Sequence, residues 1–130
     1  MTEPRQLLVD IREARSALES GAASIAKLTL DFEGRDDENK VWVPGPKWRY
    51  KDAVLTATLA IREQFDGKPP NAALVEQIAE RKVKEQDPQL WHDYHRLASQ
   101  IEATKLWLSA KKEAVSALQS ELSTERALAR

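Results

Sequence analysis

The last third of the sequence is predicted to form one uninterrupted helix, and no other stretch limits the possible folds as strongly. Asp87 is a good N-cap, Pro88 occupies the first helical position, where its missing N–H costs nothing, and no Gly or Pro follows before Arg126. A helix of about 40 residues is roughly 60 Å long. Few domains of 130 residues cover such a rod alone, so we expect further helices to pack along it.

Apolar residues recur along this helix in alternating steps of four and three, the spacing of a coiled-coil seam. This row, the long seam, comprises Leu90, Tyr94, Leu97, Ile101, Thr104, Leu108, Lys111, Val115, Leu118, Leu122 and Glu125. Beside it runs the alanine row, which comprises Ala103, Trp107, Ala110, Ala114 and Ala117. Two adjacent rows indicate helices docked on two sides, which predicts a homo-oligomer.

Oligomerisation is assigned to the large apolar residues of the two rows, namely Leu97, Ile101, Trp107, Leu108, Val115, Leu118 and Leu122. The polar seam residues Thr104, Lys111 and Glu125 are compatible with assemblies from dimers to higher rings, so the copy number stays open. One alternative also stays open: the helix packs only within its own chain, as helices of bundles do.

The composition is that of a helical protein. Charged residues make up 32% of the chain, and Gly is scarce. A hydrophobic content of 42% with only 6% aromatic residues permits one thin core, so we expect an all-α protein with a single elongated domain over residues 1–130. The absence of Cys excludes disulfides, thiolate zinc sites and cysteine nucleophiles.

Neither a membrane nor an export route is indicated. No apolar run approaches the ~18 residues that a bilayer-spanning helix needs, and residues 1–4 lack the basic and then apolar pattern of a secretory signal. We therefore expect a soluble, cytoplasmic protein. The net charge of -1 argues against a wholly basic nucleic-acid binder, so any such role requires local patches.

The first helix is predicted over residues 3–33 and ends at Gly34, a natural C-terminal stop. It carries a seam of the same spacing, comprising Leu7, Ile11, Ala14, Leu18, Gly21, Ile25, Leu28 and Phe32. Gly21 within that seam either allows a close helix approach or breaks the helix.

Two shorter helices are predicted between the two long ones. The first covers residues 51–65, and the second covers 72–85 behind the N-cap Asn71. Residues 66–70 hold Gly and two Pro and interrupt them. Together with the long helix, we expect these elements to form a helical hairpin over residues 52–127.

A short extended ribbon is predicted over residues 40–51, with its clearest pattern at 41–50. The turn is assigned to Pro44-Gly45-Pro46, and apolar residues alternate on both sides of it. The preceding run, Arg35 to Lys40, is expected to be a solvated charged segment.

Basic and aromatic residues interleave in this ribbon without an intervening acid. Single-stranded nucleic acid is bound by this combination, because bases stack on aromatic faces while cations follow the phosphates. The candidate binding residues are Lys47, Trp48, Arg49, Tyr50 and Lys51. The alternative is that the aromatic rings, which include Trp42, pack back on the helices as a small core.

A second basic element lies on the long helix, where Lys105 and Lys112 are seven residues apart and so share one side. Such a column could follow a phosphate backbone. The alternative is the solvated flank of a coiled coil, balanced by Glu102 and Glu113.

No pattern indicates catalysis. His92 and His95 share a helix face, but no third ligand is suitably spaced and no HExxH motif occurs, so we assign no metal site. A Gly-rich phosphate loop and a GxSxG elbow are also absent from the sequence. We expect a protein that is not an enzyme and needs no cofactor.

The order of elements from Lys51 to Arg126 carries a resemblance. It comprises a helix at 52–62, a Gly-containing break at 66–67, a charged helix at 80–85, and a long helix with aromatic and small residues around Trp107. This order resembles the UvsY-type recombination mediators of tailed phages and other small helical phage proteins encoded beside recombination genes.

The resemblance implies an oligomeric helical assembly in the host cytoplasm that binds single-stranded DNA. It also implies contacts with a strand-exchange recombinase and a single-strand-binding protein, the first of which replaces the second. Among matching helices, the basic positions are Arg81, Lys82, Lys84, Lys105 and Lys112. We expect a non-enzymatic recombination accessory, the alternative being a coiled-coil adaptor or inhibitor that acts through protein contacts without DNA.

Overall fold

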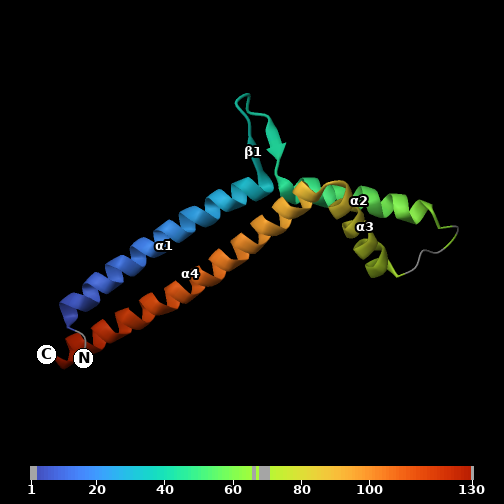
Figure 1. The fold of residues 1–130 in the computed structure, drawn as a ribbon. Coiled ribbons are helices and arrows are strands. Elements are labelled where there is room, and N and C mark those ends of the chain that lie inside the picture. Colours follow the sequence, from blue (N-terminus) through green and yellow to red (C-terminus); the bar gives the residue numbers. More distant parts are fainter. Residues whose placement is uncertain (1–2, 66, 68–70, 130) are drawn as a thin grey trace. The chain divides into compact units, whose positions relative to one another are not determined.

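The computed structural model describes residues 3–65, 67 and 71–129, and these residues are mostly helical. In chain order the elements are α1 (Pro4–Glu33), β1 (Gly34–Asp36), β2 (Trp42–Pro44), α2 (Pro46–Glu63), α3 (Ala72–Gln86) and α4 (Pro88–Leu128), shown in Figure 1. The predicted all-α class, with a long C-terminal helix and a short extended segment, is confirmed. Apart from Gly67, the predicted interruption at 66–70 lies outside the described residues.

Contacts gather the chain into two compact units. Unit 1 contains the described part of α1 up to Lys27 and α4 from Ile101 onward, whereas unit 2 contains the segment from Leu28 to Gln100. Each unit has its own buried clusters. The expectation of a single domain over residues 1–130 stays a prediction.

In unit 1, α1 and α4 lie side by side and run in opposite directions (Figure 1). Leu7 and Ile11, near the start of α1, cluster with Leu122, near the end of α4. Gly21 lies against Leu108, which precedes Leu122 by several helical turns. Early residues of α1 therefore meet late residues of α4, which defines the antiparallel packing.

The long seam is the protected side of α4. Its polar positions Thr104, Lys111 and Glu125 are only half-buried, so they avoid the full cost of leaving water. The predicted seam is thus confirmed as the packing side of the helix. Its fully buried members, each at most 9% exposed, are Leu90, Leu97, Ile101, Leu108, Val115 and Leu122.

In unit 1 this seam packs on α1 of the same chain, as in the alternative that the sequence left open. Leu118 and Leu122, both assigned to oligomerisation, contact the Leu7 and Ile11 cluster instead of requiring a second copy. The alanine row, by contrast, is exposed throughout, and Trp107 in that row is 42% exposed. A homo-oligomer therefore stays a prediction, with the alanine row as its available surface.

Gly21 allows a close helix approach and does not interrupt α1. A Cβ atom added at this position would lie 2.6 Å from Trp107 Cζ3 and 2.7 Å from Leu108 Cδ2. Real Cβ atoms do not approach neighbours so closely, so any larger residue must displace these side chains.

We expect Gly21→Leu to destabilise the protein by about 1–3 kcal/mol, because the new side chain overpacks the contact with Trp107 and Leu108. Ala22→Leu is the matched control, since Ala22 is exposed on the same helix, and its effect should stay within about 0.5 kcal/mol. Urea denaturation measures both free energies of unfolding. Equal losses in the two variants would contradict close packing at Gly21.

Unit 2 contains the two-stranded antiparallel hairpin, in which Gly34 pairs with Pro44. The predicted ribbon over 40–51 is wrong in its pairing, because the partner strand comes from the charged run at 35–40 and not from the far side of the Pro-Gly-Pro turn. The charged run was expected to be solvated, and its residues are exposed, but it also provides most of β1 and the connecting turn.

Asp37 explains why a charged run turns at this place. Its Oδ1 accepts hydrogen bonds from the backbone N–H of Asn39 at 2.8 Å and of Val41 at 3.0 Å. Lys40 closes the turn with a positive φ of 60°. A short acidic side chain that bonds its own backbone favours turns, so the run turns here while its side chains stay exposed.

The ribbon prediction is also wrong beyond Pro44, because residues 47–51 belong to the first turns of α2. Gly45 is extended, with φ −80° and ψ −179°, and Pro46 follows at the start of the helix. Proline favours this position because its fixed φ suits a helix and its missing N–H needs no partner. Pro-Gly-Pro therefore starts a helix here instead of turning a ribbon.

The starts of α3 and α4 follow the sequence closely. The Asn71 side chain accepts a hydrogen bond from the N–H of Ala73 at 3.0 Å, and Asp87 Oδ1 accepts one from the N–H of Leu90 at 3.2 Å. Both predicted N-caps are confirmed. The helix ends agree to within two residues with the predicted spans of 72–85 and 88–126.

Helices α2 and α3 pack on each other through an apolar cluster of Ile61, Val75 and Ala79. A second cluster joins Tyr50 and Val83 to Leu90 of α4. Helices α2 and α3 therefore pack together in unit 2, and the helical hairpin predicted over 52–127, which includes the long helix, stays a prediction. In unit 1, the partner of α4 is α1.

Candidate nucleic-acid interface

Aromatic rings from the end of α1 and the starts of α2 and α4 meet inside unit 2. Tyr50 and Tyr94 stack with ring centroids 4.1 Å apart, and Phe32 lies 5.4 Å from Tyr94. Tyr50 is only 4% exposed. The prediction that Tyr50 binds nucleic acid is wrong, because its ring is already stacked in the core and cannot accept a base.

The Tyr50 hydroxyl is buried and has no hydrogen-bond partner among the described residues. Burial, followed by the nearby groups Glu80, Tyr94 and Glu76, raises the pKa of Tyr50 from 10.0 to about 12. Both causes disfavour the phenolate, so the group stays a neutral donor. Leaving such a donor unpaired costs about 1–3 kcal/mol.

We expect Tyr50→Phe to raise the free energy of unfolding at pH 7 by about 1 kcal/mol, because the substitution removes an unpaired buried hydroxyl. The original protein should also lose stability as the pH rises from 10 towards 12, since the unfolded chain releases the tyrosine proton first. The variant lacks that loss, so its advantage should grow with pH. Urea denaturation at pH 7 and at pH 11 measures the difference, and an advantage equal at both values would contradict the raised pKa.

Trp48 is on the solvent side of the first turn of α2 and is 45% exposed. The Nζ atoms of Lys47 and Lys51 lie 5.0 Å and 5.4 Å from the centroid of its ring, within the range of cation–π contacts. Arg49 is exposed on the same turn. We call Lys47, Trp48, Arg49 and Lys51 the Trp48 platform.

An ion pair positions this platform. Lys47 Nζ also lies 3.0 Å from Glu33 Oε1, which joins the start of α2 to the last residue of α1. A second close approach supports the same junction, because a Cβ on Gly45 would clash with the carbonyl oxygen of Phe32. The platform therefore lies at a helix start that both the ion pair and the close backbone contact attach to the end of α1.

The alternative that the Trp rings of this segment pack back as a small core is wrong for both rings. Tyr50 is in the core, but Trp48 is half-exposed and Trp42 on β2 is 52% exposed. Val41 and Val43 beside Trp42 are exposed as well. The hairpin therefore presents an apolar surface of its own.

The predicted cations of α3 lie on its last turns. Lys84 Nζ is 4.3 Å from the ring centroid of Trp91 on α4, so a second tryptophan carries a lysine over its face. Arg81 is exposed, and Lys82 is half-buried. These three cations belong to unit 2, as does the Trp48 platform.

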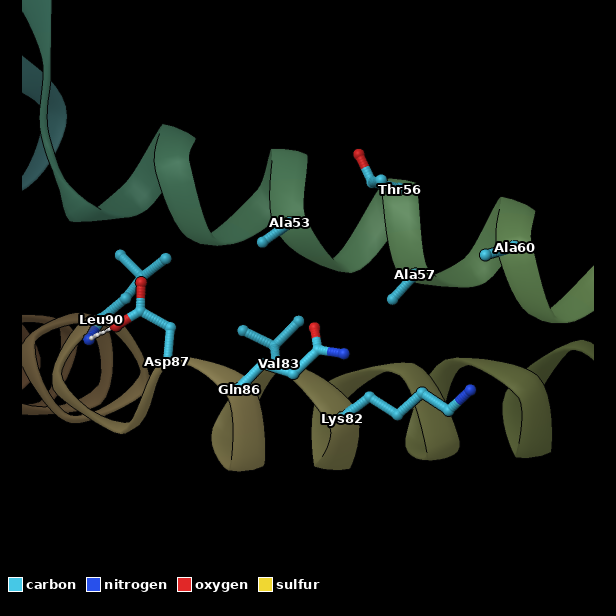
Figure 2. A pocket seen from close by; sticks show the side chains of 9 residues that line it. All are labelled: Ala53, Thr56, Ala57, Ala60, Lys82, Val83, Gln86, Asp87 and Leu90. Atoms are coloured by element: carbon cyan, nitrogen blue, oxygen red, sulfur yellow. Dashed lines mark hydrogen bonds between the residues drawn. The ribbon is translucent and has the colours of Figure 1, made fainter.

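Lys82 also lines a pocket of about 420 Å³ between α2, α3 and the first turn of α4 (Figure 2). Figure 2 shows Ala53 and Ala57 of α2 directed towards α3, with Val83 directed back towards α2. Small side chains on α2 leave this space open between the two helices. Its wall is mostly alkyl, with Asp87 already engaged as the cap of α4.

Lys105 and Lys112 lie on α4 within unit 1, and both are exposed. Lys105 Nζ lies 3.9 Å from Glu102 Oε1, an exposed pair that contributes little to stability. This pair agrees with the solvated flank that was the alternative for the column. Lys112 extends the same side of the helix two turns later.

Sequence reasoning missed a surface on α2. Leu55 and Leu59 are 57% and 52% exposed, and with Arg62 they continue in steps of four and three. The alternating steps of four and three that identified the long seam would also have identified this row on α2. They were overlooked because Val54, Ala57 and Ile61, on the other side of α2, already supplied a core face.

Among the described residues, no group of three or more His, Asp or Glu side chains could hold a metal ion. The His95 ring lies 4.5 Å from the Trp91 ring and 5.1 Å from the Tyr94 ring, so it packs as an aromatic group. None of the helices in the described part of the chain combines the length and apolar character needed to cross a lipid bilayer.

No protein-family model matches the chain, and the comparisons with curated proteins and with solved structures found no match either.

Proposed function

We propose that this protein is a non-enzymatic accessory of DNA recombination that binds single-stranded DNA in the cytoplasm, in the manner of a phage recombination mediator. The observation that carries the proposal is the Trp48 platform, a half-exposed indole with two lysines near its ring and an arginine beside it. An aromatic face among cations binds single strands with little sequence preference, because every base has a face that can stack.

The proposal gives each group of the platform a role. A base stacks on the exposed part of the Trp48 ring, and Lys51 and Arg49 pair with the flanking phosphates. Lys47 contributes less, because Glu33 already neutralises part of its charge. Lys84 with Trp91 offers a second, weaker site of the same chemistry, with Arg81 and Lys82 nearby in the sequence. Lys105 and Lys112 remain candidates for backbone contacts in unit 1.

We expect Trp48→Ala to lower the affinity for a single-stranded oligonucleotide by about 1–3 kcal/mol, the usual value of one stacked base. The logarithm of the association constant should fall with the logarithm of salt with a slope of about −1.4, because Lys51 and Arg49 each release about 0.7 counterion. Arg49→Ala should make that slope shallower by about 0.7. Fluorescence anisotropy at several salt concentrations measures both quantities.

Trp42→Ala is the matched control, because Trp42 is also an exposed tryptophan of unit 2 but no described lysine lies over its ring. Its affinity should stay within about twofold of the original. Loss of binding in the Trp42 variant together with unchanged binding in the Trp48 variant would contradict the platform. Tighter binding to duplex than to single strands would contradict a mediator.

In this proposal the protein acts as a homo-oligomer, and the alanine row of α4 forms the contact between copies. Small side chains let two identical helices approach closely, and the row is exposed in the single chain. The resemblance to recombination mediators also implies contacts with a strand-exchange recombinase and a single-strand-binding protein, and the proposed role includes both.

We expect Ala110→Glu with Ala114→Glu to convert the oligomer to a monomer, because the new charges would be buried between copies. Ser116→Glu is the control, since Ser116 is exposed outside the alanine row, and it should leave the oligomer intact. Sedimentation equilibrium measures the mass of each variant. A monomeric original protein at micromolar concentration would contradict this part of the proposal.

A second candidate function is a coiled-coil adaptor or inhibitor that binds a protein and no DNA. The exposed Leu55 and Leu59 on α2 favour it, because large apolar side chains in a row are uncommon on a surface without a partner. Absence of salt-sensitive oligonucleotide binding, with a partner found on α2, would select this function.

A further inference from the structure

The outer side of α2 carries a row that the fold does not use. Leu55 and Leu59 are both more than half exposed, whereas Ile61 on the inner side is 3% exposed. Single exposed leucines are normal on protein surfaces. Two of them one helical turn apart form a ridge, and a ridge of this spacing is what a second helix packs against.

A groove of about 430 Å³ lies next to this ridge, between α2 and α3. Its wall on α2 is formed by side chains on one helix face, and its wall on α3 by residues four apart. The lining residues are Tyr50, Lys51, Val54, Leu55, Thr58, Arg62, Ala72, Glu76, Glu80 and Tyr94. Leu55 belongs to both features, so ridge and groove form one surface.

The two walls of the groove carry opposite charges. Lys51 and Arg62 are on the α2 wall, and Glu76 and Glu80 are on the α3 wall. In the described part of the chain no ion pair joins the two walls. The charges are therefore separated across an apolar floor, so each wall can pair with a charge of a bound segment.

A buried donor at the groove is also unpaired. The Tyr50 hydroxyl, on a side chain that is 96% removed from solvent, has no hydrogen-bond partner among the described residues. Buried polar groups in folded proteins nearly always have a partner. The unpaired hydroxyl belongs to a residue that lines the groove, but the atom itself is buried.

We propose that this groove and the Leu55–Leu59 ridge bind an amphipathic helix of a partner protein, whose apolar row packs on the ridge and whose carboxylates pair with Lys51 and Arg62. Charge complementarity selects this occupant. A purely basic helix would be repelled by the α2 wall, and a purely apolar one would leave all four charges unpaired. A helix with Glu on one flank and Lys on the other satisfies both walls.

This inference does not rest on DNA binding. Lys51 serves both surfaces, but Leu59 and Arg62 lie outside the Trp48 platform. Substitutions at those two positions should leave the affinity for single-stranded DNA near its original value. Trp48→Ala should weaken DNA binding and leave helix binding intact, so the failure of one proposal is distinguishable from the failure of the other.

The test uses three labelled peptides of about 18 residues, each roughly 27 Å long as a helix. The first has a leucine row with Glu on one flank and Lys on the other. The second has the same row with Lys on both flanks, and the third has the charges of the first with Ser in place of Leu. Fluorescence anisotropy measures binding of each to the full chain.

We expect the first peptide to bind with micromolar affinity and the other two to bind at least about tenfold more weakly. Leu59→Ser should weaken binding of the first peptide by a similar factor. Arg62→Glu should reduce the preference of the protein for the first peptide over the second. Leu74→Ser is the control, because Leu74 is an exposed leucine on α3 that does not line the groove. It should leave all three affinities unchanged.

Circular dichroism and the melting temperature should be unchanged in the Leu59 and Arg62 variants, since both side chains are exposed. Equal binding of the three peptides, or no binding of any, would overturn the proposal. It would also be overturned if Leu59→Ser turned an oligomer into a monomer, because the occupant would then be a second copy of this chain.

Discussion

Burial of one side of α4 is the constraint on which the rest of the structure depends. A helix of 41 residues without an internal Gly or Pro cannot fold back on itself, so its apolar seam needs a cover from elsewhere. In unit 1 that cover is α1, and Gly21 brings the two helices close enough for Leu108 to be buried. Burying each large aliphatic side chain contributes about 1.5–3 kcal/mol, which far exceeds the cost of a half-buried Thr104 or Lys111 in the same row.

The start of α2 decides which aromatic rings can reach a ligand. Residues two apart in a helix point about 200° apart, whereas in a strand they point to the same side. Because Pro46 starts a helix, Tyr50 turns into the core against Tyr94 while Trp48 turns to solvent. An extended ribbon would have exposed or buried both rings together. One proline at a helix start thus separates a structural aromatic residue from a candidate binding residue.

The sequence predicted those elements whose information is local. Asn71, Asp87 and Gly34 mark helix boundaries through their own side-chain or backbone chemistry, and the seam follows from a count of steps. It failed where the outcome depends on pairing between segments. The strand partner of Trp42 lies across a turn that Asp37 closes, and Pro-Gly-Pro suits a turn and a helix start equally well. The sequence also does not decide which helix packs on the long seam, because α1 and a second copy of the chain offer similar apolar rows.

The packing of α1 and α3 also determines which apolar surfaces stay exposed and available for binding. Once α1 occupies the seam in unit 1 and touches the ring of Trp107, the alanines of the alanine row stay exposed on α4. In unit 2, α3 covers the inner side of α2. The outer side of α2 exposes Trp48 among its cations and, further along, Leu55 and Leu59 beside a groove with charged walls.

These two exposed surfaces of α2 differ in chemistry. The first offers a planar ring and positive charge, which suits a base and its phosphates, and the second offers branched apolar side chains between charges of both signs, which suits a helix. As proposed, a single helix presents a nucleic-acid surface and a protein surface, because its two ends expose different residues on the side that the core does not need.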